Sequence, residues 1–190
     1  MLAAMPVMAA YTGHVYVDKN KNGVFDQSEK PLAGIKVSDG LNVVETAADG
    51  SFTLPGHERE RFIFITTPSG YKTFNRHYHK IEKKQSGYDF GLIPYSGRIR
   101  KDGSHRYIHI TDTEIFNTEN HADWVNNVRD YARNEQAAFI IHTGDICYEK
   151  GLKAHIKLMN TENMDCPVFY CIGNHDLVKG KYGEELFESI

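Results

Sequence analysis

The feature that most constrains the fold is a set of three short apolar runs, each of which ends in side chains with metal-binding atoms. The runs cover residues 107–110, 138–141 and 168–172, and the polar segments after them are 112–114, 144–145 and 173–176. Successive segments are roughly thirty residues apart, the length of one strand–helix–strand unit. Right-handed crossovers between parallel strands would bring the three carboxyl ends to one edge of a sheet, where open sheets bind ligands. The pattern therefore predicts a metal site at that edge.

The sequence between these runs has the apolar periodicity of helices. In the first interval, apolar residues recur at three- and four-residue steps, namely Trp124, Val125, Val128, Tyr131 and Ala132. In the second interval the repeat is looser, and the pair Cys166-Pro167 would end any helix there. We therefore expect residues 105–176 to form a parallel βαβαβ unit.

The motifs at the ends of the runs resemble those of a known family. Asp112-x-Glu114, Gly144-Asp145 and Gly173-Asn174-His175-Asp176, in this order and spacing, are similar to the motifs of the calcineurin-like metallophosphoesterase superfamily. The resemblance covers about residues 104–190. The alternative interpretation is a Rossmann-like sheet whose Asp and Asn residues only cap the helices that follow them.

The resemblance implies a catalytic centre with two divalent ions of the Mn, Fe, Zn or Mg class and a phosphoester substrate. Asp145 would bridge the two ions, Asp112 would complete the first, and Asn174 would bind the second. His175 would lie near the scissile phosphate and protonate or stabilise the leaving group, while Asp176 would hold its ring. The implied reaction is attack of hydroxide on phosphorus.

Two features depart from the family's pattern. The first motif of the family usually has histidine where this sequence has Glu114, which could ligate a hard divalent ion through oxygen or stand off it through a water. The Gly-His-x-His motif that completes the family's site does not occur before Ile190. We therefore expect an incomplete catalytic domain, and we expect the isolated chain to have little phosphoesterase activity.

The N-terminal half contains a separate candidate site. Residues 18–29 match the calcium-loop template D-x-[DN]-x-[DN]-G-x5-E at every specified position. The expected calcium ligands are Asp18, Asn20, Asn22, the carbonyl of Val24, Asp26 and Glu29. Strand-like residues flank the loop, so it would join strands rather than helices. The alternative is a turn without metal, since Asn and Gly form turns in any case.

The rest of this half is predicted to consist of short strands and turns. Strands are expected at residues 14–17, 35–38, 42–46, 51–54, 61–66 and 88–92, hairpin turns at Asp39-Gly40 and Asp49-Gly50, and a solvated loop at 76–84. Short strands at even spacing favour a β-sandwich. This half resembles the N-terminal domain of exported bacterial calcineurin-like phosphoesterases, most clearly at residues 37–40 and 49–55.

Length and composition agree with a two-domain α+β protein. An all-β sandwich at residues 11–94 would be followed by a linker at 95–104 and, at 105–190, by the first βαβαβ part of an α/β metallophosphoesterase sandwich. The net charge of −3 gives no nucleic-acid signature, and no apolar run approaches the ~20 residues of a transmembrane helix. Residues 1–10 are similar to the end of a signal peptide, which favours export to the periplasm or the cell surface. Nothing indicates an oligomeric state.

Two functional hypotheses from different classes follow. The first is a metal-dependent phosphoester hydrolase with a β-sandwich appendage, of which this chain is a fragment. The second is a non-catalytic, calcium-stabilised β-sandwich binding module fused to an inactive phosphoesterase remnant. Histidine ligands encoded beyond Ile190 would favour the first hypothesis.

Overall fold

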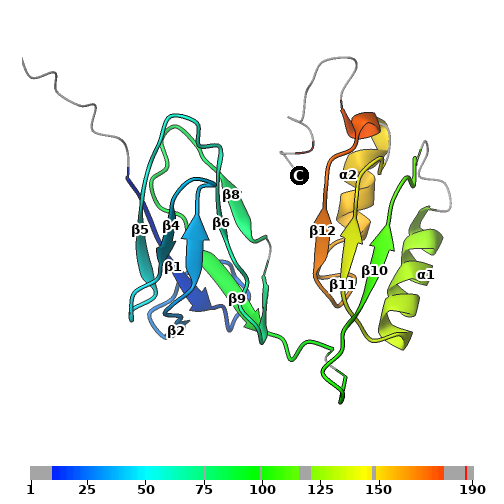
Figure 1. The fold of residues 1–190 in the computed structure, drawn as a ribbon, viewed down its shortest axis with the longest axis horizontal. Helices are drawn as coiled ribbons and strands as arrows, with labels where there is room; N and C mark the ends of the chain where they lie inside the picture. Colours follow the sequence, from blue (N-terminus) through cyan, green and yellow to red (C-terminus); the bar gives the residue numbers. More distant parts are fainter. Residues whose placement is uncertain are drawn as a thin grey trace, which may run out of the picture. The chain divides into compact units, whose positions relative to one another are not determined.

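The computed structural model of the chain describes residues 10–74, 76–98, 100–115, 121–146, 149–177 and 187, with residues 149 and 150 described by their backbone. The chain divides into two compact units, Met1–Tyr95 and Ser96–Ile190. The first unit is rich in strands and the second contains both helices and strands (Figure 1). The expected signal-peptide remnant lies outside the described residues except for Ala10, which begins the first strand.

The first unit contains two sheets. One is built from β1 (Ala10–Val17), β2 (Lys30–Pro31), β5 (Ser51–Pro55), β7 (Tyr71–Thr73) and β9 (Phe90–Pro94), in the order β2-β1-β9-β7 with β5 also paired to β1. The other is built from β3 (Lys36–Ser38), β4 (Val43–Glu45), β6 (Phe62–Ile65) and β8 (Tyr78–Lys80), in the order β4-β3-β6-β8. These strands include all six that the sequence predicts in this half.

Alternate residues of both sheets form one hydrophobic core. Val15 and Leu54 of the first sheet are fully buried, as are Val37 and Ile63 of the second, and all belong to the same cluster. Alternation of buried and exposed residues is what a strand with one solvated face requires, because successive side chains point to opposite sides. The predicted β-sandwich is therefore confirmed.

Two local expectations for the sandwich are wrong. The segment 76–84, expected as a loop, contains β8, which pairs with β6. The Asp49-Gly50 turn does not close a hairpin, since it links β4 to a strand that pairs with β1 in the other sheet. Asp-Gly chemistry favours a tight turn, and it does not determine which strand the chain pairs with next.

The second unit is a parallel three-stranded sheet with two helices. Its strands are β10 (Arg106–Ile110), β11 (Ala137–His142) and β12 (Val168–Tyr170), and between them lie α1 (His121–Asn134) and α2 (Glu149–Leu158). The strands are parallel in the order β10-β11-β12, and Figure 1 shows their arrowheads pointing the same way. A short 3₁₀ helix, η1 (Asn174–Asp176), follows β12. The predicted βαβαβ unit is confirmed, and with it the two-domain α+β fold.

The helices cover the face of β11 that carries its buried residues. Ala138, Ile140 and His142 alternate along the strand and are buried, and the ring of His142 contacts that of His155 on α2. Val125 and Ala132 are the buried apolar residues of α1 and lie about two turns apart on the predicted helix face. Among the described residues, neither helix has the length and apolar composition needed to cross a bilayer.

Candidate metal centre

The turns that follow β10 and β11 have a strained backbone. Asp112, Glu114 and Asp145 are non-glycine residues in the left-handed region, with φ of 50°, 43° and 49°. Such conformations cost of order 1–3 kcal/mol each, and they persist where the surrounding structure enforces them. All three are predicted metal ligands, and they make up three of the six described non-glycine residues with positive φ.

Backbone hydrogen bonds join these two turns. The Asp112 N–H donates to the Gly144 carbonyl at 3.1 Å, and the Glu114 N–H donates to the Asp145 carbonyl at 3.0 Å. These bonds extend the pairing of β10 and β11 past the ends of both strands. The first and second motifs are thereby held side by side.

The turns after β11 and β12 are in direct contact through their glycines. A Cβ atom on Gly173 would lie 2.2 Å from the Asp145 nitrogen, and a Cβ on Gly144 would lie 2.6 Å from the Gly173 nitrogen. No other residue has room at either position without moving the neighbouring backbone. Two adjacent glycine-bearing turns therefore bring the second and third motifs together.

The Asp176 carboxylate hydrogen-bonds to both the turn after β11 and the turn after β12. Its side chain is buried, and its two carboxylate oxygens accept hydrogen bonds from the backbone N–H groups of Ile146, at 2.9 Å, and Gly173, at 2.8 Å. The Asp145 carboxylate in turn accepts the His175 N–H at 3.0 Å. Asp176 thus ties the two turns to each other, and its expected role in holding the His175 ring stays a prediction.

Three side chains from the three motifs converge. Donor atoms of Glu114, Asp145 and His175 all lie within 4.8 Å of one another. His175 Nδ1 is 3.2 Å from a Glu114 oxygen and 3.9 Å from an Asp145 oxygen. The two carboxylates, Glu114 and Asp145, are predicted ligands and offer the oxygen donors that a divalent ion such as Mn, Fe or Mg accepts. These two residues therefore fit the predicted metal, and the imidazole of His175, predicted as a catalytic group, lies beside them.

The other two predicted ligands lie at the margin of this group. Asp112 is exposed, its carboxylate accepts a hydrogen bond from the Thr111 hydroxyl, and it stands outside the described metal-binding group. Asn174 is exposed and begins η1, one residue before His175. Both belong to the same turns as the converging residues, so their backbone is held at the site.

A buried cluster of histidines lies behind the turns, and sequence reasoning did not identify it. His142 and His155 are fully buried, and His121 Nε2 lies 2.9 Å from His155 Nδ1. Burial lowers the pKa of His142 to about 4 and the pKa of His155 to about 3. The one available signal was the position of His142 on the buried alternation of its strand.

The calcium-type loop of the first unit is closed by hydrogen bonds to its own carboxylates. Asp18 is buried and accepts the N–H groups of Asn22, at 3.2 Å, and Gly23, at 2.9 Å. Glu29 is buried and accepts the N–H groups of Lys19, at 2.9 Å, and Asp26, at 3.1 Å. These bonds bring the first and last predicted ligands to the base of one loop.

The remaining predicted ligands of this loop lie nearer to solvent. The side-chain amides of Asn20 and Asn22 both donate to one carboxylate oxygen of Asp26, at 2.7 and 3.1 Å. Val24 is exposed, and its backbone N–H donates to the Asn22 side-chain oxygen. The adjacent Tyr16 hydroxyl is buried and has no hydrogen-bond partner. Burial, followed by the nearby charge of Asp18, raises the pKa of Tyr16.

Each half of the chain matches a known protein family. Residues 19–94 match the family described as the N terminal of calcineurin-like phosphoesterase, and residues 105–189 match the calcineurin-like phosphoesterase family itself. No individual curated protein matches the chain. The chain belongs to the calcineurin-like phosphoesterase superfamily, whose members are metal-dependent phosphoesterases.

The buried histidines predict how stability depends on pH. Above about pH 6.5 both His142 and His155 are neutral whether the chain is folded or unfolded. Below about pH 6.5, these two histidines bind protons in the unfolded chain but stay neutral in the folded unit, because their folded pKa values are near 4 and 3. As the pH is lowered through this window, the free energy of unfolding should decrease. The decrease should be at most about 1.4 kcal/mol per pH unit for each histidine.

The single tryptophan, Trp124, lies in this unit and reports its unfolding by fluorescence. His155→Gln should give a shallower loss of stability between pH 7 and pH 5, whereas His105→Gln, at an exposed position, should leave the slope unchanged. Equal stability of the wild-type unit at the two pH values would contradict the neutral burial of these rings.

Proposed function

We propose that this chain carries the metal-dependent phosphoester-hydrolysing centre of its superfamily at the carboxyl ends of β10, β11 and β12. The observation that supports it is the convergence of Glu114, Asp145 and His175, one residue from each of three turns at one sheet edge. Strained backbone at Glu114 and Asp145 adds to it, since strain of this kind clusters at functional sites.

The roles we assign follow from the chemistry of each side chain. Asp112, Glu114, Asp145 and Asn174 are the proposed oxygen ligands for divalent ions of the Mn, Fe, Zn or Mg class. When bound, two such ions supply Lewis-acid charge stabilisation and hydroxide near neutral pH. The protein's own oxygens must hold their positions before substrate arrives, and the hydrogen bonds between the turns do this.

His175 is the proposed proton donor to the leaving alkoxide of the phosphoester. The Glu114 carboxylate lies 3.2 Å from His175 Nδ1, so it favours a ring that carries a proton on this nitrogen. Nε2 is then the nitrogen available to the substrate. Asp176 holds the backbone of the turn that presents the ring.

The setting of this reaction is also a proposal. The apolar N-terminal residues and a loop suited to millimolar calcium support export to the periplasm or the cell surface. Residues 1–190 contain no Gly-His-x-His motif, which the superfamily uses to complete its site. We propose that efficient turnover needs such further histidines.

Activity should be assayed on the protein as its native gene encodes it, with an aryl phosphomonoester or phosphodiester and Mn²⁺. Asp145→Asn should abolish metal-dependent turnover, because an amide oxygen replaces the carboxylate proposed to bridge the two ions and is a poorer ligand. His175→Ala should lower the rate by roughly 10²–10⁴ on a substrate with a poor leaving group, as for loss of a general acid. Metal content should be measured for each variant by elemental analysis.

Asp123→Asn, which removes an exposed carboxylate on α1, is the matched control and should keep the wild-type rate. Full activity of His175→Ala with its metal retained would refute the role of His175. A protein that binds calcium but no Mn, Fe, Zn or Mg ion would refute the enzyme hypothesis and favour the binding-module hypothesis.

We further propose that the loop at residues 18–29 binds calcium and stabilises the sandwich. The sequence match at every template position and the unpartnered buried hydroxyl of Tyr16 beside the loop carboxylates support this. The site is independent of the phosphoesterase centre. It is also the observation that favours the second candidate function, a calcium-stabilised binding module.

Calcium should raise the melting temperature of the first unit. A ligand that binds only the folded state at a hundredfold excess over its Kd stabilises by about 2.7 kcal/mol. Calorimetric melting with millimolar calcium and with chelator should show this difference in the wild type and in Asp49→Asn, which alters an exposed turn carboxylate. Glu29→Gln should remove it. Identical melting of the wild type in calcium and in chelator would contradict the site.

A further inference from the structure

We propose that His142 is a positioning residue of the metal centre, which acts by bridging Thr113 and Gly144. Thr113 lies between Asp112 and Glu114, and Gly144 directly precedes Asp145. The inference rests on the proposed function for its consequence, while the bridge itself can be tested without metal.

The hydrogen bonds around the His142 ring form a consistent chain. The Gly144 N–H donates to Nδ1 at 3.3 Å, so a neutral ring must carry its proton on Nε2. Nε2 lies 3.0 Å from the Thr113 hydroxyl oxygen and donates to it. The Thr113 hydroxyl then donates to the Ile146 carbonyl at 2.6 Å. Every donor in this chain meets an acceptor, which fixes the tautomer of the ring.

The surroundings hold the His142 ring in place. It is fully buried, it stacks on Tyr170 of β12 with centroids 5.8 Å apart, and it meets His155 of α2 edge to face at 5.8 Å. His155 is itself paired with His121 of α1. The ring therefore links both helices and the last strand to the turns that carry the ligands.

The bridge matters because the turns are strained. Three left-handed residues at roughly 1–3 kcal/mol each would relax toward ordinary backbone conformations if nothing opposed them. Backbone bonds between the turns oppose part of this relaxation. The His142–Thr113 contact adds a side-chain constraint on the middle residue of the first turn, between its two carboxylates. Removing such a supporting contact typically weakens metal binding by about 10–100-fold.

The first test uses amide hydrogen exchange on the metal-free 190-residue chain. Thr113→Val keeps the shape of the side chain and removes the hydroxyl, whereas Thr113→Ser keeps the hydroxyl. Exchange at the Glu114 and Gly144 amides, which donate to the Asp145 carbonyl and to His142 Nδ1, should be at least tenfold faster in the valine variant and close to wild type in the serine variant. Wild-type exchange rates in the valine variant would overturn the bridge.

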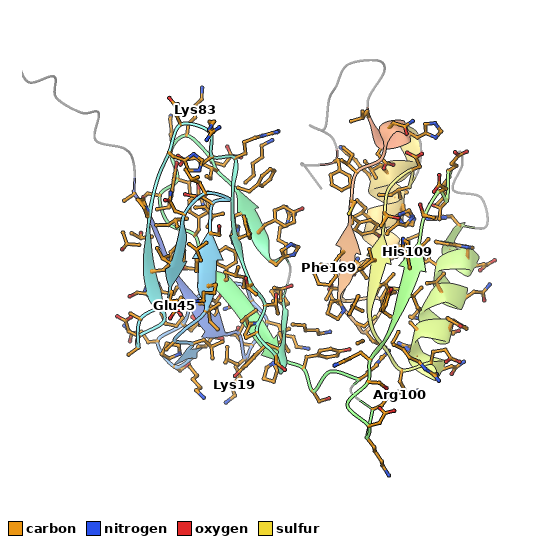
Figure 2. The ribbon with its side chains drawn as sticks, in the orientation of Figure 1. Lys19, Glu45, Lys83, Arg100, His109 and Phe169 are labelled. Atoms are coloured by element: carbon orange, nitrogen blue, oxygen red, sulfur yellow. The ribbon has the colours of Figure 1, made fainter. Side chains whose placement is uncertain are left out.

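The second test measures the Kd for Mn²⁺ by calorimetry. Thr113→Val should weaken binding about 10–100-fold, with Thr113→Ser restoring it to within about twofold. Arg100→Gln is the control, because Arg100 is exposed in the loop before β10, at the end of that strand opposite to the ligand-bearing turns (Figure 2). Its affinity should equal that of the wild type.

The two tests separate the two proposals. Unchanged Mn²⁺ affinity in Thr113→Val, with binding intact in the wild type, would overturn the positioning role of His142. A wild type that binds no Mn²⁺ would overturn the proposed function, and the exchange rates would still decide whether the bridge holds the turns.

Discussion

The second unit depends on the contact between the turn after β11 and the turn after β12. Gly144 and Gly173 lie so close that neither has room for a side chain. Because they touch, Asp145 faces the turn of His175, and the carboxylate of Asp176 can reach backbone N–H groups on both sides. Separating the turns would move Asp145 away from His175, whose donor atoms lie within 4.8 Å of each other in the proposed metal centre.

Two buried polar side chains beside this contact hold the turns in place. Asp176 and His142 are buried, and each pairs with amides or hydroxyls of the ligand-bearing turns rather than with solvent. Buried polar networks stabilise one geometry when each member is satisfied. The strain at Asp112, Glu114 and Asp145 is thus opposed from beneath the sheet edge, and the carboxylates themselves stay available at its surface. This division between supporting and ligating groups is what a preorganised metal site requires.

Much of this could be predicted from the sequence, because the spacing of Asp112, Asp145 and Asn174 follows the repeat of strand and helix. The parallel sheet and the sandwich followed from periodicity and turn residues. The His142–Thr113 bond could not be predicted, since it joins residues 29 apart through the register of two strands. The approach of Glu114 to His175 likewise depends on how two turns pack. β8 was missed because its three residues carry too little apolar pattern to be distinguished from a loop.

The central claim is that the contact of the two glycine turns creates the metal site, and Gly173→Ala tests it most directly. Its Cβ would lie 2.2 Å from both the nitrogen and a carboxylate oxygen of Asp145. Calorimetric titration with Mn²⁺ should show binding at least tenfold weaker than in the wild type. Gly87→Ala, where a Cβ meets open space, should bind as the wild type does. Wild-type Mn²⁺ affinity in Gly173→Ala would contradict the account.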